Sequence, residues 1–537
     1  MVATKKVANS KKKQLILNAF VESCSGHQSP GLWRHPDDKS ADFNRIEHWV
    51  ELATLLEAAK FHGIFIADVL GGYDVYQGSL DAAIKSSAQW PVNEPLAIVP
   101  AMAAATKSIG FGVTCATTYE QPYHLARRLS TVDHLTHGRV GWNIVTGYLD
   151  SAARNLVNGS DQPSHDERYE IAEEYLKVMY KLWQSSWRDD AVQLNKATGV
   201  FTDPTLVRKI DHKGKYYTVP GPHICQPSPQ RTPVLLQAGT SKAGKAFASQ
   251  HAEAIFVAGH SPAVVAKNIA DIRAQAKSDY DRDPQSIKFL AMICPIVGRT
   301  EAEAHAKFED YQQYGDLDGA LALFGGWTGI DLAEYADDQE LRHVESNAIR
   351  SAVEGWSKAS PGIPKWTKLT VGKHITVGGL GATVVGTPTQ VADEFERWVS
   401  EADVDGFNIA YAIKPGTFVD VAELLIPELK RRGIFWDDYA VPGGTYRENL
   451  TATKGAAHPT KDHPASKYQW RSGVSAEDAI IPSDSANTIL RSNENQAKVN
   501  DADKQVTPSR KRAAAHGLPK SDIKARRKSA RQSLAIS

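Results

Sequence analysis

Cysteine is scarce in this chain, whose 537 residues include four, Cys24, Cys115, Cys225 and Cys294. They lie far apart in the sequence and form no CxxC pair, so we expect neither a disulfide framework nor a zinc site. This usage is typical of reduced thiols in the cytoplasm. Small disulfide-stabilised secreted proteins are therefore excluded as a class.

Long apolar segments are also missing. No run approaches the roughly 20 apolar residues that a membrane-spanning helix needs, and the Lys-rich start, residues 5–13, is not followed by the apolar part of a signal peptide. Net charge is missing too, because 62 Lys and Arg balance 62 Asp and Glu. We expect a cytoplasmic protein that contacts no membrane and lacks the basic surface of a nucleic-acid binder.

Several nucleotide and metal motifs are absent. The chain has no GxxxxGKS or GxxxxGKT loop, no GxGxxG after a strand and no HExxH. Neither a nucleoside triphosphate site nor a Rossmann-type nicotinamide site is therefore indicated. His134 and His137 lie close together, but they are better explained as the approach to a turn at Gly138. We expect no bound metal.

What the chain does have is a series of short apolar runs, separated by stretches with helical periodicity. This alternation is typical of a parallel sheet built from βα units. Eight such units predict an α/β fold of the closed (β/α)8, TIM-like barrel type rather than an open sheet. The eight runs are residues 15–20, 64–68, 109–115, 140–145, 234–239, 254–257, 289–297 and 406–411.

Helical segments are predicted between these runs. Ile46, Trp49, Val50, Ala53 and Leu56 recur at helical spacing and should face the sheet. A second helix is predicted to begin at the sequence TPTQ, residues 387–390, where Thr387 can cap, Pro388 suits the first position and Gln390 can reach back. The interval between the fourth and fifth runs and the interval 301–384 are too long for plain crossovers, and such insertions often form lids.

Three parts follow from this pattern: a basic N-terminal extension, residues 1–13, the barrel, residues 14–450, and a C-terminal tail, residues 451–537. The tail is rich in Ser, Asn, Lys, Ala and Pro, and we expect it to be disordered. From Lys504 onward it carries ten Lys or Arg against the single acidic Asp522. Such a charge run either is merely solvated, or binds nucleic acid, or serves as a nuclear address.

Polar side chains follow several of the predicted strands, where function collects in barrels of this kind. Asp68 ends the second run, Thr114 lies at the end of the third, and Asn143 lies in the apolar fourth run. Each has an alternative explanation, since Asp68 can cap the next turn and Thr114 and Asn143 can bond to the backbone. A heterocycle with both donors and acceptors, such as a flavin ring, would also satisfy them.

Two segments indicate a phosphate site. Ser164 and Glu167 resemble a capping box that begins a helix on which His165 and Tyr169 share one face. The fifth run ends in QAGTS, residues 237–241, so Thr240 and Ser241 offer hydroxyl groups and amides at another helix N-terminus. A structural cap and a tight βα turn explain the two segments equally well.

In order along residues 14–450, these pieces resemble the family of nitrilotriacetate, EDTA, pristinamycin-synthase and dibenzothiophene-sulfone monooxygenases, which are bacterial-luciferase-like enzymes. The phrases that carry the resemblance are LNAF at 17–20, GLWRHP at 31–36, AD at 67–68, DHLTHGRVGWNIVT at 133–146, HDERY at 165–169, PSPQ at 227–230, QAGTS at 237–241 and DGFNI at 405–409. GHQSPGLWRHP at 26–36, with GYDVY at 72–76, is most similar to the dimethyl-sulfide monooxygenase branch. Thr240 departs from the Ala or Ser often found in relatives.

The resemblance implies a monooxygenase that uses reduced FMN and O2, with the flavin ring over the barrel mouth near Asp68, Thr114 and Asn143. It implies phosphate binding by His165, Tyr169, Thr240 and Ser241. The loop after the first strand would turn two residues, His27 and Trp33, toward the reacting edge of the flavin, with Trp33 contacting substrate. His27 is the expected catalytic residue, because the ordinary pKa of histidine lies close to neutral pH and suits it to donate a proton.

The same resemblance implies partners and a substrate class. A separate NAD(P)H:FMN oxidoreductase would supply the reduced flavin, and we expect a homo-oligomer. The first-strand loop has few fixed charges apart from Arg34, so a dialkyl sulfide or sulfone fits better than an aminopolycarboxylate such as nitrilotriacetate, which remains the alternative substrate. A deazaflavin enzyme that transfers hydride and a non-catalytic barrel acting through its basic tail are the other readings.

Overall fold

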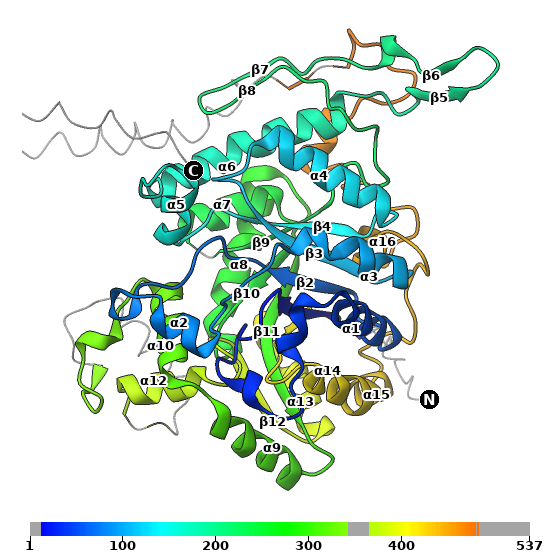
Figure 1. Cartoon of the computed structure of the whole chain (residues 1–537). Helices are drawn as coiled ribbons and strands as arrows, with labels where there is room; N and C mark the ends of the chain where they lie inside the picture. Colours follow the sequence, from blue (N-terminus) through cyan, green and yellow to red (C-terminus); the bar gives the residue numbers. More distant parts are fainter. Residues whose placement is uncertain (1–11, 240, 342–362, 364, 480, 483–537) are drawn as a thin grey trace, which may run out of the picture. The chain divides into compact units, whose positions relative to one another are not determined.

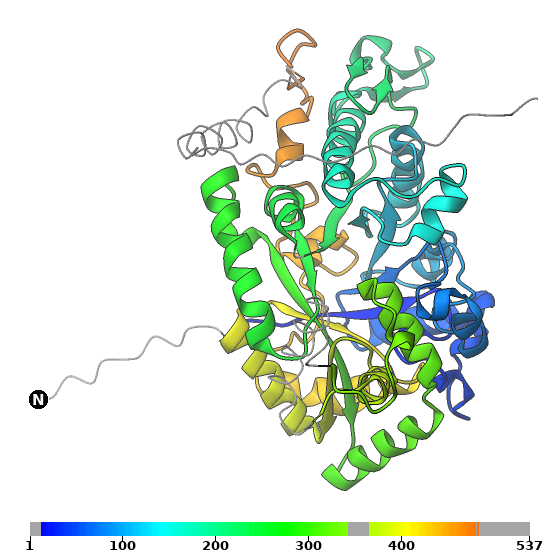
Figure 2. The same cartoon turned by 90° about the vertical axis from the view of Figure 1, so that its left-hand side faces the viewer.

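Each of the eight predicted apolar runs contains a strand in the computed structural model, which describes residues 12–239, 241–341, 363, 365–479, 481 and 482. The strands pair in parallel, and the ring closes where β13 pairs with β1. Figures 1 and 2 show the strands with helices packed around them. The predicted barrel is confirmed. Its strands, in order around the ring, are β1 (Ile16–Glu22), β2 (Gly63–Ala67), β3 (Gly110–Ala116), β4 (Val140–Val145), β9 (Val234–Ala238), β10 (Ala254–Val257), β11 (Lys288–Val297) and β13 (Gly406–Ile409).

A further strand, β12 (Ala382–Gly386), lies outside this ring and was not predicted. The long strand β11 has β13 along one edge, and along its other edge it has first β10 and then β12. Its first half pairs with β13 up to Ile293, and its second half, from Ile293 to Val297, pairs with β12. β12 therefore widens the sheet at the carboxyl end of β11, on the side of the barrel where the strands end.

Helices surround the barrel and cover its strands. In α1 the residues Trp49, Ala53 and Leu56 are buried as predicted, whereas Ile46 at the start of the helix is exposed. The predicted capping box at Thr387 is present, because Thr387 and Gln390 each accept the other's backbone N–H. The helices are α1 (Ile46–Ala58), α3 (Val99–Ala105), α4 (Pro122–Leu135), α6 (His165–Tyr180), α7 (Lys242–His251), α8 (Pro262–Tyr280), α13 (Pro388–Ala402), α14 (Gly416–Asp420) and α15 (Ile426–Arg431).

Both long intervals carry helices or strands in their described parts. The first adds α5 (Asp150–Leu156) and two antiparallel hairpins, β5 (Val192–Asn195) with β6 (Val200–Thr202) and β7 (His212–Lys213) with β8 (Thr218–Val219). The second adds α9 (Glu301–Tyr314), α10 (Leu317–Thr328) and α12 (Lys368–Ile375). α10 packs against α12 and against α2 (Asp81–Ser86), and these three helices gather at one side of the barrel (Figure 1).

The amino-terminal end of the barrel is filled by the short helix α16 (Tyr446–Leu450). The ring of Tyr446 lies among the first residues of neighbouring strands, because a Cβ atom on Gly110 would come within 2.2 Å of it. A Cβ atom on Gly63 would likewise lie only 2.8 Å from the Tyr446 hydroxyl oxygen. Tyr446 thus closes the end of the barrel opposite to the one where the strands terminate.

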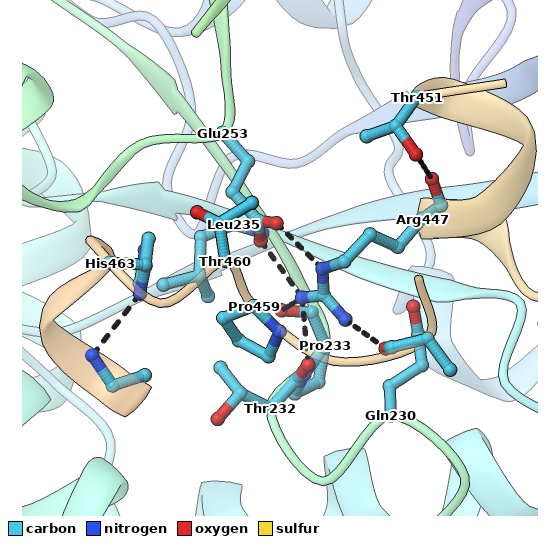
Figure 3. A network of polar contacts seen from close by, with 12 residues as sticks. Gln230, Thr232, Pro233, Leu235, Glu253, Arg447, Thr451, Pro459, Thr460 and His463 are labelled. Carbon is cyan, nitrogen blue, oxygen red and sulfur yellow. Dashed lines mark hydrogen bonds and ion pairs between the residues drawn. The ribbon is translucent and has the colours of Figure 1, made fainter. Parts of the chain in front are cut away.

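Arg447, the next residue, forms a buried network at the same end (Figure 3). Its Nε and Nη2 donate to the two carboxylate oxygens of Glu253, at 2.6 and 2.8 Å, and Nη2 also donates to the carbonyl of Thr232. Nη1 donates to the carbonyl of Ala457. A paired, fully hydrogen-bonded guanidinium of this kind fixes the C-terminal segment to the starts of β9 and β10.

The expected start of a disordered tail at residue 451 is wrong. His463 is fully buried and donates from Nε2 to the carbonyl of His251. Trp470 is buried, and its backbone N–H donates to the carbonyl of Gln184. The segment was missed because it packs in irregular turns, apart from a 3-10 helix at Pro464–Tyr468, and so has no periodicity. The basic run after Lys504 lies outside the described residues, as does most of the expected N-terminal extension, of which Lys13 pairs with Asp405 at 2.9 Å.

Two negative findings concern the described residues alone. No helix among them is long and apolar enough to cross a membrane. No group of three or more His, Cys, Asp and Glu side chains among them is placed to hold a metal ion. All four cysteines are described and are free thiols.

Candidate active site

A cavity of about 240 Å³ opens at the carboxyl ends of the barrel strands. Most of its surface is apolar and comes from side chains on different strands, because alternate residues of each strand face the barrel interior. These apolar lining residues are Phe20, Phe65, Val145, Phe256 and Met292. This is the face on which TIM-like barrels carry their active sites.

Asp68, Thr114 and Asn143 line this cavity together. The Asn143 amide donates from Nδ2 to the Thr114 hydroxyl at 2.9 Å, and that hydroxyl donates to the carbonyl of Ile66 at 2.9 Å. Thr114 is therefore engaged by the backbone, as the alternative explanation predicted. The Asn143 oxygen, Oδ1, is buried and has no hydrogen-bond partner among the described residues. A buried amide oxygen of this kind is an acceptor for a ligand's N–H.

The Asp68 carboxyl follows β2 at the edge of the cavity. Burial raises its pKa to about 8, and the charges of Glu22 and Glu94 act in the same direction. Below that pH the group is a neutral acid that can donate a hydrogen bond. The cavity therefore carries less negative charge near neutral pH than its residue types suggest.

His27 lies in the loop after β1 and lines the cavity, with its ring 4.4 Å from that of Phe20. Burial lowers its pKa to about 3, and the positive charge of Lys414 adds to the effect. The position of His27 agrees with the expectation, but the pKa does not. A desolvated imidazole next to a buried cation is neutral near pH 7. It can donate a hydrogen bond, but it does not carry the additional proton that a general acid would transfer.

Several cavity residues were missed from the sequence. The side-chain amide of Gln89 donates to the carbonyl of His27 at 2.7 Å and its oxygen accepts from Tyr73 at 2.5 Å. The Tyr73 hydroxyl lies 2.7 Å from that of Tyr148 and accepts from the indole of Trp327 at 3.2 Å. Trp327 belongs to α10, so the second insertion reaches the cavity wall, as a lid would. The only sequence signal was the GYDVY phrase that contains Tyr73.

The predicted phosphate residues come together beside this cavity, from α6 and α7. Ser241 caps α7 and accepts the Gly244 amide at 3.1 Å. The Tyr169 hydroxyl lies so close to the α7 turn that a Cβ atom on Gly239 or Gly244 would come within 3 Å of it. Since Ala238 lines the cavity and Gly239 follows it, this turn adjoins the cavity. Thr240 lies outside the described residues.

His165 begins α6 as predicted, but the expected capping box does not form, because Ser164 makes no side-chain bond to the helix. The His165 ring lies 5.2 Å from that of Tyr169, and its Nδ1 lies 2.8 Å from the Asp166 carboxylate. The first amides of α6 are thus not used by a cap. With the N-terminus of α7 close by, they make the turn a favourable place for an anion.

Trp33 is not brought to the cavity. Its indole N–H donates to the carbonyl of Ser86 at 3.1 Å, and the side chain is 39% exposed. It lies on a 3-10 turn, Leu32–Arg34, that packs toward α2. The expected role of Trp33 in substrate binding therefore has no support from its position.

The sequence profile of the family described as luciferase-like monooxygenase matches residues 23–405, which span most of the barrel. The chain belongs to the luciferase-like monooxygenase family. Enzymes of this family are flavin-dependent oxidoreductases, and the apolar cavity is compatible with that chemistry. The (β/α)8 barrel and the monooxygenase assignment made from the sequence are both confirmed.

Individual luciferase-like monooxygenases are similar over nearly their whole length. Dimethyl-sulfide monooxygenase of Hyphomicrobium sulfonivorans is 48% identical over 479 residues, 89% of this chain and 98% of that protein. Long-chain alkane monooxygenase of Geobacillus thermodenitrificans is 46% identical over 457 residues, with coverages of 85% and 98%.

Solved structures of this family superpose on the barrel. The crystal structure of DmoA from Hyphomicrobium sulfonivorans has a TM-score of 0.81 at 48% identity, covering 85% of this chain and 96% of that one. A riboflavin lyase crystallised with modified FMN and riboflavin has a TM-score of 0.75 at 32% identity, covering 85% of this chain and all of the other.

Proposed function

We propose that this luciferase-like monooxygenase uses reduced FMN and O2 to oxygenate a small uncharged substrate, such as a dialkyl sulfide or sulfone. The observation that carries the proposal is the apolar cavity of about 240 Å³ next to the anion site at Ser241. A flavin ring that occupies one part of it leaves room only for a small molecule. The 48% identity to a dimethyl-sulfide monooxygenase supports the same substrate class.

The residues present fit reduced FMN. The apolar walls suit the faces of the ring, the free Asn143 oxygen suits an N–H on its edge, and Asp68 can donate a hydrogen bond. Ser241, Tyr169 and the N-termini of α6 and α7 would hold the phosphate, with His165 nearby. Thr240 stays a predicted phosphate residue that lies outside the described part of the chain. When bound, the flavin supplies the electrons and activates the oxygen. The protein's part is to exclude water and to hold the substrate.

A polycarboxylate substrate would require several cations at the cavity. The sequence offers four arginines that could serve this purpose, and none of them is among the described residues that line the cavity: Arg34, Arg127, Arg128 and Arg139. Arg139 is buried and donates to the carbonyls of Thr136 and Ala103. Arg128 pairs with Glu94 and Glu120. The acidic groups that do line the cavity would repel a chelate once ionised.

The first prediction concerns substrate choice. With reduced FMN and O2, we expect dialkyl sulfides or sulfones to give oxygenated product coupled to flavin oxidation. Aminopolycarboxylates should give only hydrogen peroxide, because nothing retains them. Chromatography of the product beside a peroxide assay separates the two results. The opposite preference, or coupled turnover of a long-chain alkane alone, would contradict the substrate assignment but not the flavin chemistry.

The second prediction concerns the phosphate site. Ser241→Ala and Tyr169→Phe should each weaken reduced-FMN binding by about 1 to 2 kcal/mol, the usual loss for one hydrogen bond to a charged group. Anaerobic fluorescence titration measures the effect. Ser249→Ala, which removes a buried hydroxyl farther along α7, is the matched control and should leave affinity unchanged. Equal affinity of both site variants and the wild type would place the phosphate elsewhere.

A separate NAD(P)H:FMN oxidoreductase would supply the reduced flavin, since the sequence has no nicotinamide fingerprint. The purified chain with NADH, FMN and O2 should stay inactive until such a reductase is added. Robust turnover by the chain alone would show that no separate reductase is needed. Assembly into a homo-oligomer also remains a prediction, which sedimentation can check.

A further inference from the structure

Glu22 is a buried acidic residue in the wall of the cavity. It is the last residue of β1, its side chain is fully buried, and it lines the same space as His27 and Asp68. Oε2 accepts a hydrogen bond from the Cys24 thiol at 3.2 Å, whereas Oε1 has no hydrogen-bond partner among the described residues. A buried carboxyl oxygen left without a partner is costly, and in a cavity it marks a group that meets a ligand.

Lys414 places a positive charge close to this carboxyl. Its side chain is fully buried, and Nζ has no hydrogen-bond partner among the described residues. Nζ lies over the faces of two rings, 4.8 Å from the centre of Trp49 and 5.2 Å from that of Tyr411. Aromatic faces stabilise a cation without neutralising it. Burial lowers the pKa of Lys414 to about 8, against the raising effect of Cys24, Asp38 and Glu22, so Lys414 is mostly a cation at pH 7 and its charge acts on Glu22 there.

We propose that Glu22 is a catalytic acid of this cavity, which gives a proton to oxygen during turnover, and that Lys414 is the positioning residue that compensates the carboxylate left behind. The proposal rests on the proposed function, because it requires O2 to be reduced next to the substrate. Both residues lie outside the set that the sequence analysis assigned to the site.

The surrounding charges favour Glu22 over the other candidates. Burial raises its pKa to about 8, while the Cys24 hydrogen bond and the charge of Lys414 keep it from rising further. The pKa of His27 is lowered to about 3, so its ring is neutral near pH 7 and cannot act as a cationic acid. Asp68 also has a raised pKa, but the charges that act on it are the acids Glu22, Glu94 and Glu120, so its ionised form is uncompensated.

The remaining titratable groups coupled to this pair do not compete as acids near neutral pH. Burial raises the pKa of the Cys24 thiol and of the Tyr411 hydroxyl, and it raises those of Tyr73 and Tyr148 as well. Asp38 accepts the backbone N–H of Lys414 at 2.8 Å and the Ser40 N–H, so its carboxylate is already bound by the backbone. Glu22 is thus the neutral acid whose ionised form has a cation nearby.

The proton balance is simple. Reduced flavin carries the two electrons and two protons needed to place one oxygen atom of O2 on the substrate and release the other as water. As the O–O bond breaks, the Glu22 O–H bond breaks as well, and its proton goes to the oxygen atom that leaves. The second proton of that water comes from the reduced flavin, which ends oxidised. Glu22 becomes a carboxylate near Lys414 and regains its proton from the other flavin proton, so the acid is not consumed.

The test begins with the flavin-free protein. Infrared difference spectra of wild type against Glu22→Gln should show a protonated carboxyl band at pH 7 that disappears as the pH rises past about 8. Lys414→Met should keep the band to higher pH, because the compensating charge is gone. Asp68→Asn is the matched control, which removes its own band and leaves that of Glu22. Should Glu22→Gln fail to fold, the band that responds to Lys414→Met identifies the group.

The second readout is turnover. Glu22→Gln, which keeps the shape and loses the acid, should bind reduced FMN normally, slow product formation by about 100-fold or more and release hydrogen peroxide instead. Glu22→Asp should recover part of the rate. An ionised Glu22 at pH 7, or full coupled activity of Glu22→Gln, overturns the proposal while wild-type oxygenation leaves the proposed function intact. Absence of any oxygenation by wild type refutes the proposed function instead, whatever the infrared result.

Discussion

Val145→Trp should abolish the binding of reduced FMN while leaving the barrel folded. Val145 ends β4 and lines the cavity, on the same face of the strand as Asn143, two residues earlier. An indole at this position would occupy the space assigned to the flavin ring. We expect affinity to fall by about 100-fold or more, which corresponds to about 2.7 kcal/mol or more at about 1.4 kcal/mol per factor of ten.

The control for this variant is Leu135→Trp. Leu135 is 58% exposed at the end of α4, so the same enlargement there should change neither binding nor melting temperature. Anaerobic titration with reduced FMN, read beside circular dichroism, compares the two variants. Wild-type affinity in a folded Val145→Trp protein would show that the flavin binds outside this cavity.

Arg447→Leu should destabilise the protein by about 3 to 5 kcal/mol, the range observed when one partner of a buried ion pair is removed. Glu253 would then stay buried beside the start of β10 with its backbone contact to Leu235 alone (Figure 3). Burial by itself raises the pKa of Glu253, and Arg447 reverses this to hold the pKa below its usual value. The variant should therefore carry a Glu253 with a raised pKa.

Urea unfolding measures this loss, with Arg431→Leu as control. Arg431 pairs with Glu428 at 2.6 Å, but its side chain is 69% exposed, and exposed pairs contribute little. A small effect of Arg447→Leu, similar to that of the control, would mean that the C-terminal segment does not stabilise the barrel.

The barrel strands were predictable because each is a short apolar run, and a short apolar run is typical of a buried strand in a parallel sheet. β12 was missed because its residues, Ala382–Gly386, lie at the end of a long insertion and pair with only half of β11. The segment around Trp470 was missed for a different reason. Its buried residues are separated by polar turns, so they show neither the helical nor the strand period of apolar residues.

The site was predictable where a strand end coincides with an unusual polar residue, as at Asp68 and Asn143. Glu22 and Lys414 gave no such signal, since an isolated acid and an isolated lysine in a sequence are most often exposed. Lys414 is enclosed by Trp49 and Tyr411, which are 365 and 3 positions away from it in the sequence. Trp33 is the opposite case. It was predicted at the cavity because it belongs to a sequence motif that resembles the family, but it lies elsewhere.

The stoichiometry of the reaction shows whether the chain oxygenates its substrate with reduced FMN and O2. Reduced FMN is mixed anaerobically with the protein and a dialkyl sulfide, O2 is then admitted, and product, consumed O2 and hydrogen peroxide are measured. We expect equal amounts of consumed O2, oxidised flavin and oxygenated product, with little peroxide. Product formed before O2 is admitted, as in hydride transfer by a deazaflavin enzyme, would show that the chain is not a monooxygenase. Conversion of all the O2 to peroxide with every sulfide and sulfone tried would show the same.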